Sequence, residues 1–413
     1  MTGTTRQAID AVWRIESARL IAGLVRVVRD VGLAEDLAQD ALVAALEQWP
    51  SSGVPDNPGA WLMTVARRRG IDALRRAQTL HSRVELLRRE LSDRESPMDQ
   101  NAFDAGGEDD VLRLMFTACH PVLSVDARVA LTLKMVAGLT TEEIARAFLV
   151  QTTTMAARIT RAKKALSRAQ VPFEVPVGEE RTERLSSVLE GVYLVFNEGY
   201  TATAGEHWTR AELCQEAMRL GRMLAASAAG ESEAHALVAL MEIQASRLRA
   251  RTGPGGEMVT LEKQDRARWD RLLITHGLAA LDRAEEIDGS GCYAIQAKIA
   301  ACHAREPRAE DTDWARIACL YGDLVLLTRS PVVELNRAVA VSMADGPAAG
   351  LAVADGLRDV AALRSYHLLP SVRGDLLAKL GRAREAQAEF QRAAELTSNK
   401  AERAHLLARA TSS

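Results

Sequence analysis

Residues 138–166 read GLTTEEIARAFLVQTTTMAARITRAKKAL, a pattern that predicts two short helices joined by a tight turn. Thr140 and Glu143 have the spacing of a capping box, so the first helix is expected to begin there. Ile144 and Phe148 would lie on its apolar face. The second helix is far more basic than the first, which favours the second helix as the one that contacts a negatively charged partner.

The second helix has one apolar side and one cationic side. We expect its buried side to hold Met155, Ile159, Ala162 and Leu166, and its outer side to hold Arg158, Arg161, Lys163 and Lys164. Four polar positions open it and are expected to be exposed: Gln151, Thr152, Thr153 and Thr154. A helix-turn-helix presents the start of its second helix to base edges in the major groove and leaves cations for phosphates. An ordinary helical hairpin with a solvated basic face remains the alternative.

Length and composition predict a soluble, all-α protein of two or three domains. The chain has 413 residues, too many for one compact core. Its net charge of −3 conceals local bias, because a basic helix near residue 70 is followed by an acidic stretch near residue 100. Helical periodicity is present almost everywhere. No apolar run has the length of a membrane span and no signal peptide is apparent, so a cytoplasmic protein without membrane contact is expected.

Five cysteines, an odd and scattered set, argue against a disulfide framework. Cys292, Cys302, His303 and Cys319 are close enough in sequence to consider a metal site, but their spacing fits no structural zinc pattern. Buried thiols are therefore expected. No nucleophile, acid–base pair or phosphate-binding glycine loop is recognisable either, so the sequence predicts neither an enzyme nor a cofactor.

A helical block precedes the acidic stretch. Its early apolar positions are expected at Ala8, Val12, Ile15, Leu20, Leu24 and Val27. Three prolines and a glycine in residues 50–58 predict a loop that ends the next helix. A basic helix should follow over residues 59–78, with an apolar side of Trp61, Leu62, Val65, Ile71 and Leu74. We expect Trp61 to be a core residue more than a stacking platform for a base.

The last 230 or so residues contain signs of a helical repeat. Gly346 and Gly381 each follow an expected helix, at residues 333–343 and 372–380, and the segment after Gly381 places Phe390 among alanines. This pattern is typical of the second helix of a tetratricopeptide unit, in which small residues let paired helices approach closely. A generic α-helical bundle is the alternative for this part of the chain.

Three segments, in this order, resemble sigma factors of the extracytoplasmic-function type in the sigma-70 family. DLAQDAL (36–42) is similar to the part of region 2 that docks on the polymerase clamp, and AWLMTVARRRGIDALRR (60–76) to the part that melts and reads the −10 element. Residues 138–166 are similar to region 4, which reads the −35 element. Farther along, FNEGY (196–200), QDR (264–266) with WD (269–270), TDW (312–314) and PVVELNR (331–337) resemble the subgroup with a tetratricopeptide-like C-terminal extension.

The resemblance implies core RNA polymerase and promoter DNA as partners. It assigns polymerase binding to Asp36, Gln39 and Asp40, −10 binding to Arg67, Arg68, Arg75 and Arg76, and −35 binding to the polar and basic positions of the second helix given above. It implies region 2 at 8–85, an acidic flexible linker at 86–107, region 4 at 108–170, a linker at 171–184 and a regulatory extension at 185–413. The extension is expected to regulate the sigma module, either through contact with it or through contact with polymerase.

Two other functions fit the residues alone. An operator-binding regulator would use the helix-turn-helix without polymerase, and an interaction scaffold would carry its basic helices incidentally.

Overall fold

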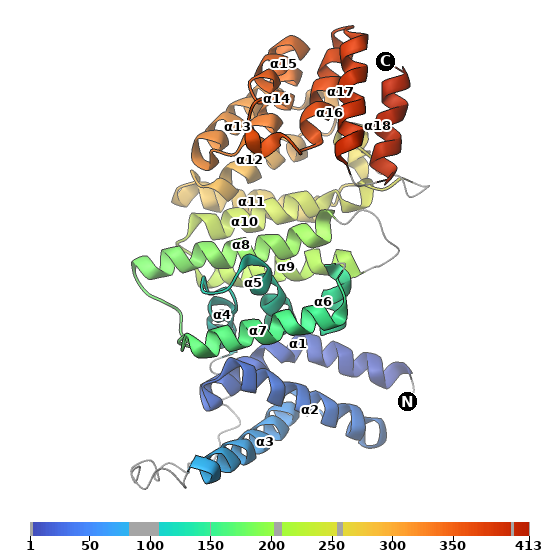
Figure 1. Ribbon diagram of the computed structural model, residues 1–413. Coiled ribbons are helices and arrows are strands. Elements are labelled where there is room, and N and C mark those ends of the chain that lie inside the picture. The colour runs from blue at the N-terminus through green and yellow to red at the C-terminus, as the bar shows by residue number, and fades with distance from the viewer. Residues whose placement is uncertain are drawn as a thin grey trace. The chain divides into compact units, whose positions relative to one another are not determined.

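The computed structural model describes residues 3–81, 107–148, 150–201, 209–253, 259–397 and 400–412, which form helices and their connections (Figure 1). The predicted acidic linker lies outside these ranges except for Gly107. The chain divides into two compact units, residues 1–228 and 229–413. The predicted extension from residue 185 onward is thus shared between the two units, each of which is described by itself below.

The first unit begins with three mutually contacting helices, α1 (Gly3–Val28), α2 (Val31–Ser52) and α3 (Pro58–His81). Asp30 caps α2 by accepting a hydrogen bond from the Leu33 amide at 2.7 Å. The expected loop at residues 50–58 is shorter than predicted, because α2 continues past Pro50. A proline in the last turn removes only one helical hydrogen bond, and the helix ends at Gly53, whose φ of 82° favours glycine.

The predicted core of these helices is only partly right. Leu20, Leu24 and Leu62 are buried, but Ile15, Val27 and Ile71 are exposed. In α1, the buried residues that the prediction did not include are Ile9, Trp13 and Ile21. The alanines and aliphatic residues of α1 are spread around the helix and not gathered on one side, so the sequence pattern does not define which side faces the core.

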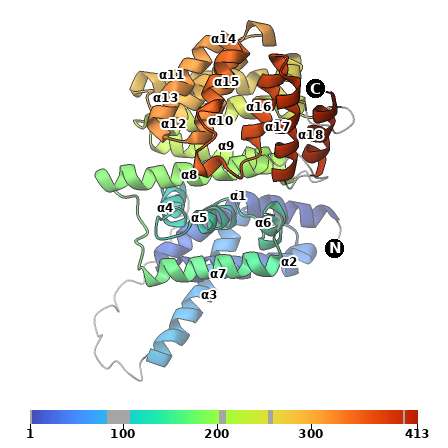
Figure 2. The ribbon, with the colours of Figure 1, turned by 45° about the horizontal axis from the view of Figure 1, so that its top comes forward.

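Seven further elements complete the first unit: α4 (Gly107–Ala118), α5 (Val125–Leu131), a π-helical turn η2 (Thr132–Val136), α6 (Thr141–Ala147), α7 (Thr152–Arg168), α8 (Glu179–Thr201) and α9 (Thr209–Ser227). α8 begins inside the segment predicted as a linker and packs on α4 and α5 (Figure 2). Its Arg184 side chain donates to the Phe116 carbonyl at 3.1 Å, and Ser187 donates to the Cys119 carbonyl at 2.7 Å.

The second unit is a succession of helices in which each contacts the next: α10 (Ser232–Ser246), α11 (Arg271–Ile287), α12 (Cys292–Arg305), α13 (Trp314–Thr328), α14 (Pro331–Asp345), α15 (Pro347–Asp355), α16 (Leu368–Lys379), α17 (Ala383–Leu396) and α18 (Lys400–Ser412). The helices expected at 333–343 and 372–380 correspond to α14 and α16. Phe390 of α17 is fully buried, and a Cβ at Gly374 of α16 would lie 2.7 Å from its ring. The glycine therefore lets α16 and α17 approach each other closely.

Candidate nucleic-acid and polymerase interface

The predicted helix-turn-helix is present as α6 and α7. The capping box forms as expected, because the Glu143 amide donates to Thr140 Oγ1 at 3.1 Å and the Thr140 amide donates to the Glu143 carboxylate at 2.7 Å. The buried residues of α7 are the four predicted ones, Met155, Ile159, Ala162 and Leu166. With its apolar side fixed in this way, α7 has a defined outer surface.

The start of α7 has the features of a base-reading surface. Gln151 is the N-cap, and it and the three threonines that follow, Thr152, Thr153 and Thr154, are all exposed. Arg161 and Lys164 are exposed farther along the helix. Arg158 is half-buried and forms an ion pair with Asp126 at 3.4 Å. Polar side chains at the helix start with cations behind them suit base edges flanked by phosphates.

Lys163 departs from the prediction that it lies on the outer side. Only 16% of its side chain is exposed, and its ammonium group contacts the Glu35 carboxylate and lies 2.9 Å from Asp36 Oδ1. Lys134 of the π-helical turn lies 3.5 Å from the other Glu35 oxygen. We call Glu35, Asp36, Lys134 and Lys163 the Glu35 cluster; it joins α7 and η2 to the first turn and a half of α2.

Electrostatics in the Glu35 cluster favour the charged lysine. Burial alone lowers the pKa of an ammonium group, but the carboxylates of Glu35 and Asp36 outweigh that effect and raise the pKa of Lys163 above its ordinary value. The Glu35 side chain is only 4% exposed and contacts both lysines. The cluster is therefore a buried ion network and differs from a loose surface contact.

The polymerase-binding candidates lie together on one side of α2. Asp36 and Asp40 are exposed and Gln39 is half-buried. Arg69 of α3 donates to the Asp40 carbonyl at 2.9 Å and lies 3.5 Å from its carboxylate. Asp36 is 71% exposed even while it contacts Lys163.

The −10 candidates lie on α3. Arg68 is exposed and Arg67 is half-buried, whereas the side chains of Arg75 and Arg76 lie outside the described part of the structure. Trp61 contacts the buried Trp49 edge to face, with 5.3 Å between ring centroids. This contact favours the core interpretation of Trp61.

Comparisons with known proteins identify three families along the chain. A model of sigma-70 region 2 matches residues 15–79, a model of sigma-70 region 4 matches residues 113–166, and a family of unknown function (DUF6596) matches residues 184–285. An uncharacterized protein of Rhizobium meliloti, R00370, is 45% identical over 94% of this chain and 91% of its own length. A probable ECF RNA polymerase sigma factor, SigI of Mycobacterium tuberculosis, is 27% identical over 42% of this chain and 59% of its own length.

The chain belongs to the extracytoplasmic-function sigma factors of the sigma-70 family. Core RNA polymerase and promoter DNA are the partners that its sigma-70 regions imply. Within the family models, α2 and α3 belong to region 2, and α4 to α7 belong to region 4. The Glu35 cluster is thus a contact between the two regions of this sigma factor.

Three further contacts join α1 and the N-cap of α2 to the segment from α4 to α7. Trp13 Nε1 donates to the Gly138 carbonyl at 3.1 Å, and a Cβ at Gly138 would lie 2.4 Å from Ser17 Oγ, so only glycine fits there. Ser167 donates to Asp30 at 3.0 Å. Arg26 of α1 forms an ion pair with Asp110 of α4 at 2.9 Å. The two regions are therefore packed against each other in this sigma factor.

The sequence interpretation missed Glu35 and Lys134, the buried partners in this contact. Glu35 lies between Ala34 and Leu37, so a signal existed: it is a charged residue in the apolar phase of α2. Its partner could not be identified, because Lys163 is 128 residues away in sequence.

The described residues contain no group of His, Cys, Asp and Glu arranged to hold a metal ion. Cys302 and His303 lie on α12 and Cys319 on α13, and no disulfide joins these cysteines. Burial raises the pKa of the Cys119 thiol to about 11, so that thiol is not reactive at neutral pH. None of the described helices combines the length and the apolar character that crossing a membrane requires.

Proposed function

We propose that this sigma factor binds core RNA polymerase through Asp36, Gln39 and Asp40, and directs initiation at promoters read by α3 and α7. The polymerase-binding residues form an acidic and polar side of α2 that suits a basic partner surface. Promoter opening leaves single-stranded DNA, which cationic side chains bind along its backbone. The −10 contacts are accordingly assigned to Arg67, Arg68, Arg75 and Arg76.

The −35 contacts are assigned to α7. Gln151, Thr152, Thr153 and Thr154 would approach base edges, and Arg158, Arg161, Lys163 and Lys164 would bind bases or phosphates. Arg161 and Lys164 are already exposed. Arg158 and Lys163 first have to leave Asp126 and the Glu35 cluster.

The observation that carries the proposal is the pairing of Lys163 with Asp36. One residue is a candidate for DNA and the other for polymerase, and they lie 2.9 Å apart; the lysine is held in the Glu35 cluster and is not available to DNA, whereas Asp36 stays largely exposed. We therefore infer that the packed arrangement is inactive in DNA binding, and that separation of regions 2 and 4 frees Lys163 and the side of α7 around it. A cleft of about 670 Å³ lies beside Lys163 and is lined in part by Arg29, Ser167 and Phe173.

We assign to the tetratricopeptide-like extension, residues 185–413, the role of holding this inactive state. Its first helices support that role. In α8, Glu190 pairs with Arg128 of region 4 at 2.8 Å, and Ser187 accepts from the same guanidinium at 2.5 Å. In α9, Glu212 pairs with Arg14 of α1 at 3.2 Å, while Arg14 also reaches Glu143 of α6 at 3.3 Å. Contacts to both regions restrain their separation.

The test uses the full-length chain in run-off transcription with purified core polymerase. Glu190→Arg places a cation against Arg128 and is expected to raise transcript yield and core affinity about fivefold or more. The double variant Arg128→Glu with Glu190→Arg restores an opposite pair and should return both values toward those of the wild type. If Glu190→Arg has no effect, or if the double variant resembles it, the extension does not act through this contact.

A footprint separates this function from that of an operator-binding regulator. The sigma factor is expected to protect promoter DNA only when core polymerase is present. Specific protection by the purified chain alone would overturn the assignment.

A further inference from the structure

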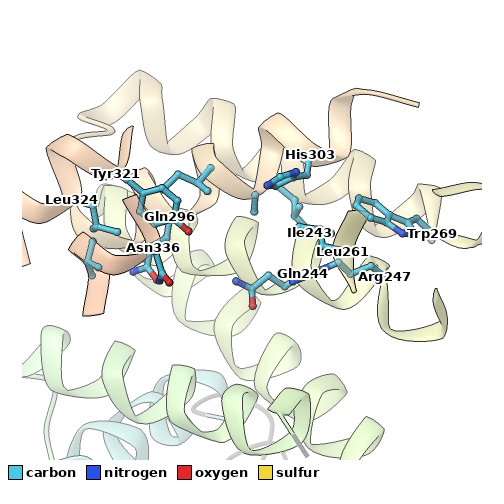
Figure 3. A pocket seen from close by; sticks show the side chains of 13 residues that line it. Ile243, Gln244, Arg247, Leu261, Trp269, Gln296, His303, Tyr321, Leu324 and Asn336 are labelled. Carbon is cyan, nitrogen blue, oxygen red and sulfur yellow. The ribbon is translucent and has the colours of Figure 1, made fainter. Parts of the chain in front are cut away.

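Helix α13 of the second unit packs on its neighbours with one side only. Ile317, Leu320 and Leu324 are buried and form a core cluster with residues of α12 and α14. Leu324 and Tyr321 also line a pocket of about 220 Å³ whose other walls come from α10, α12, α14 and the connection before α11, as Figure 3 shows. These contacts account for the position of α13 in the unit, and they leave its opposite side exposed.

The exposed side of α13 carries large apolar side chains near its end. Leu326 is 78% exposed and Leu327 is 53% exposed, and Val332, just after the short connection to α14, is 36% exposed. Ala315 and Cys319 are exposed nearer the start of α13 and lie on the same side of the helix as Leu326. We call these five residues the α13 face. Single exposed apolar residues are ordinary, but a group of them marks an interaction surface.

Two exposed charges flank the α13 face, Arg316 and Asp323. About two helical turns separate them, so both lie along the same edge of the face, with Cys319 beside their midpoint. Within the described part of the chain, neither side chain forms an ion pair or a hydrogen bond. The face thus has a cation toward one end and an anion toward the other, and both are available to a partner.

A second copy of the chain fits this arrangement of charges. When two identical helices pack antiparallel about a twofold axis, each edge of one helix lies beside the same edge of the other. With the axis near Cys319, Arg316 of each copy lies opposite Asp323 of the other, which makes two identical ion pairs. A parallel pairing would instead place each charge beside its own equivalent. The charges therefore select the antiparallel arrangement.

The sizes of the side chains fit the same arrangement. In the antiparallel register set by the charges, Leu326 of each copy lies over Ala315 of the other, so a large side chain meets a small one. Burying leucines that are otherwise in water supplies the favourable free energy of association. The α13 face is therefore complementary to itself in charge and in side-chain size.

We propose that the chain forms a homodimer in which the two α13 faces pack antiparallel. A contact made by one helix and the start of the next is smaller than the roughly 800 Å² per partner of a standard interface, so a dissociation constant of about 1–100 µM is expected. The proposal concerns the second unit and does not rest on the assignment of DNA and polymerase sites to the first.

The experiment is sedimentation velocity of the full-length chain over a concentration series from about 1 to 200 µM, which spans the expected dissociation constant. Arg316→Asp and Asp323→Arg each replace two attractive pairs by two repulsive ones, so each should raise the dissociation constant about tenfold or more. The double variant exchanges the two charges and should return the constant to within about threefold of the wild type. Circular dichroism checks that every variant is folded.

An equimolar mixture of the two single variants gives a sharper test of the register. Each variant alone repels itself, but in a mixed dimer both pairs are opposite in charge, so the mixture should form a heterodimer at least as tight as the wild-type dimer. No other arrangement of α13 predicts this result for both substitutions together.

Two leucines provide a matched comparison for the apolar contact. Leu326→Ser should weaken the dimer about tenfold or more, whereas Leu272→Ser, at a residue of α11 that is 73% exposed, should leave the dissociation constant unchanged. A wild-type chain that stays monomeric throughout the series would overturn the proposal, and so would a dimer that either charge reversal leaves intact. Failure of the double variant or of the mixture to restore association would overturn it as well.

Discussion

Replacing Lys163 by methionine is expected to loosen the packing of region 4 on region 2, whereas the same change at Lys164 leaves it intact. The two lysines are neighbours on α7 and differ in their surroundings: Lys163 is 16% exposed within the Glu35 cluster, and Lys164 is exposed. Methionine keeps most of the length of the side chain and removes the charge. The comparison therefore isolates the buried ion network.

The magnitude follows from which partners remain. Removing one partner of a buried ion pair destabilises a protein by about 3–5 kcal/mol. Lys134 still faces Glu35 in the variant, so the lower end, about 3 kcal/mol, is expected. The contact with the 71% exposed Asp36 adds less than about 1 kcal/mol. Lys164→Met should change stability by less than about 0.5 kcal/mol.

Amide hydrogen exchange measured by mass spectrometry is a suitable assay because it resolves α2 and α7 separately. In Lys163→Met, exchange at the start of α2 and along α7 should accelerate about 100-fold, the factor that corresponds to about 3 kcal/mol. Adding Glu35→Gln should reverse part of the effect, since the buried carboxylate no longer lacks a partner. Equal exchange in the Lys163 and Lys164 variants would refute the reasoning.

Three further outcomes are expected. Gly374→Ala forces a Cβ to within 2.7 Å of the Phe390 ring and should lower the free energy of unfolding of the second unit by about 1–3 kcal/mol, measured in urea, whereas Gly322→Ala, with no atom within 4 Å, should not lower it. His303 has a pKa of about 4 in the folded protein and 6.5 ordinarily, so its contribution to the free energy of unfolding is complete above pH 6.5. That contribution falls by at most about 3 kcal/mol as the pH drops to 4, and His303→Gln should abolish this part of the pH dependence of the melting temperature. Lys164→Ala should reduce the salt dependence of promoter binding by the polymerase complex by about one unit of slope, and an unchanged slope would remove Lys164 from the phosphate contacts.

The helix-turn-helix could be predicted from the sequence in detail. Its signals are local: a capping box at Thr140 and Glu143, and an apolar spacing in α7 that matches all four buried side chains. The same method failed in α1, where Ile15 is exposed and Ile9 is buried. The apolar residues of α1 are spread around that helix, and its packing against α2, α3 and α4 decides which of them are buried.

Contacts between distant residues lay beyond the sequence pattern. Lys163 and Lys164 have equivalent local sequence, and only the position of α2 makes one of them a buried partner of Glu35. The pocket of the second unit brings together side chains from residue 243 to residue 336. Arg266 and Thr312 lie in two of the segments that carry the family resemblance, and a hydrogen bond between their side chains ties the connection before α11 to the connection before α13.

If the proposed site assignments are right, the Glu35 cluster links the binding of polymerase thermodynamically to the binding of DNA. On the proposed assignment, separation of the Glu35 cluster makes Lys163 available to DNA and leaves Asp36 to polymerase, so both partners favour the separated state. Each ligand then strengthens the other by the same factor, without touching it. On this proposal, free protein in the packed arrangement would bind promoter DNA weakly, and DNA binding would be confined to copies already joined to polymerase.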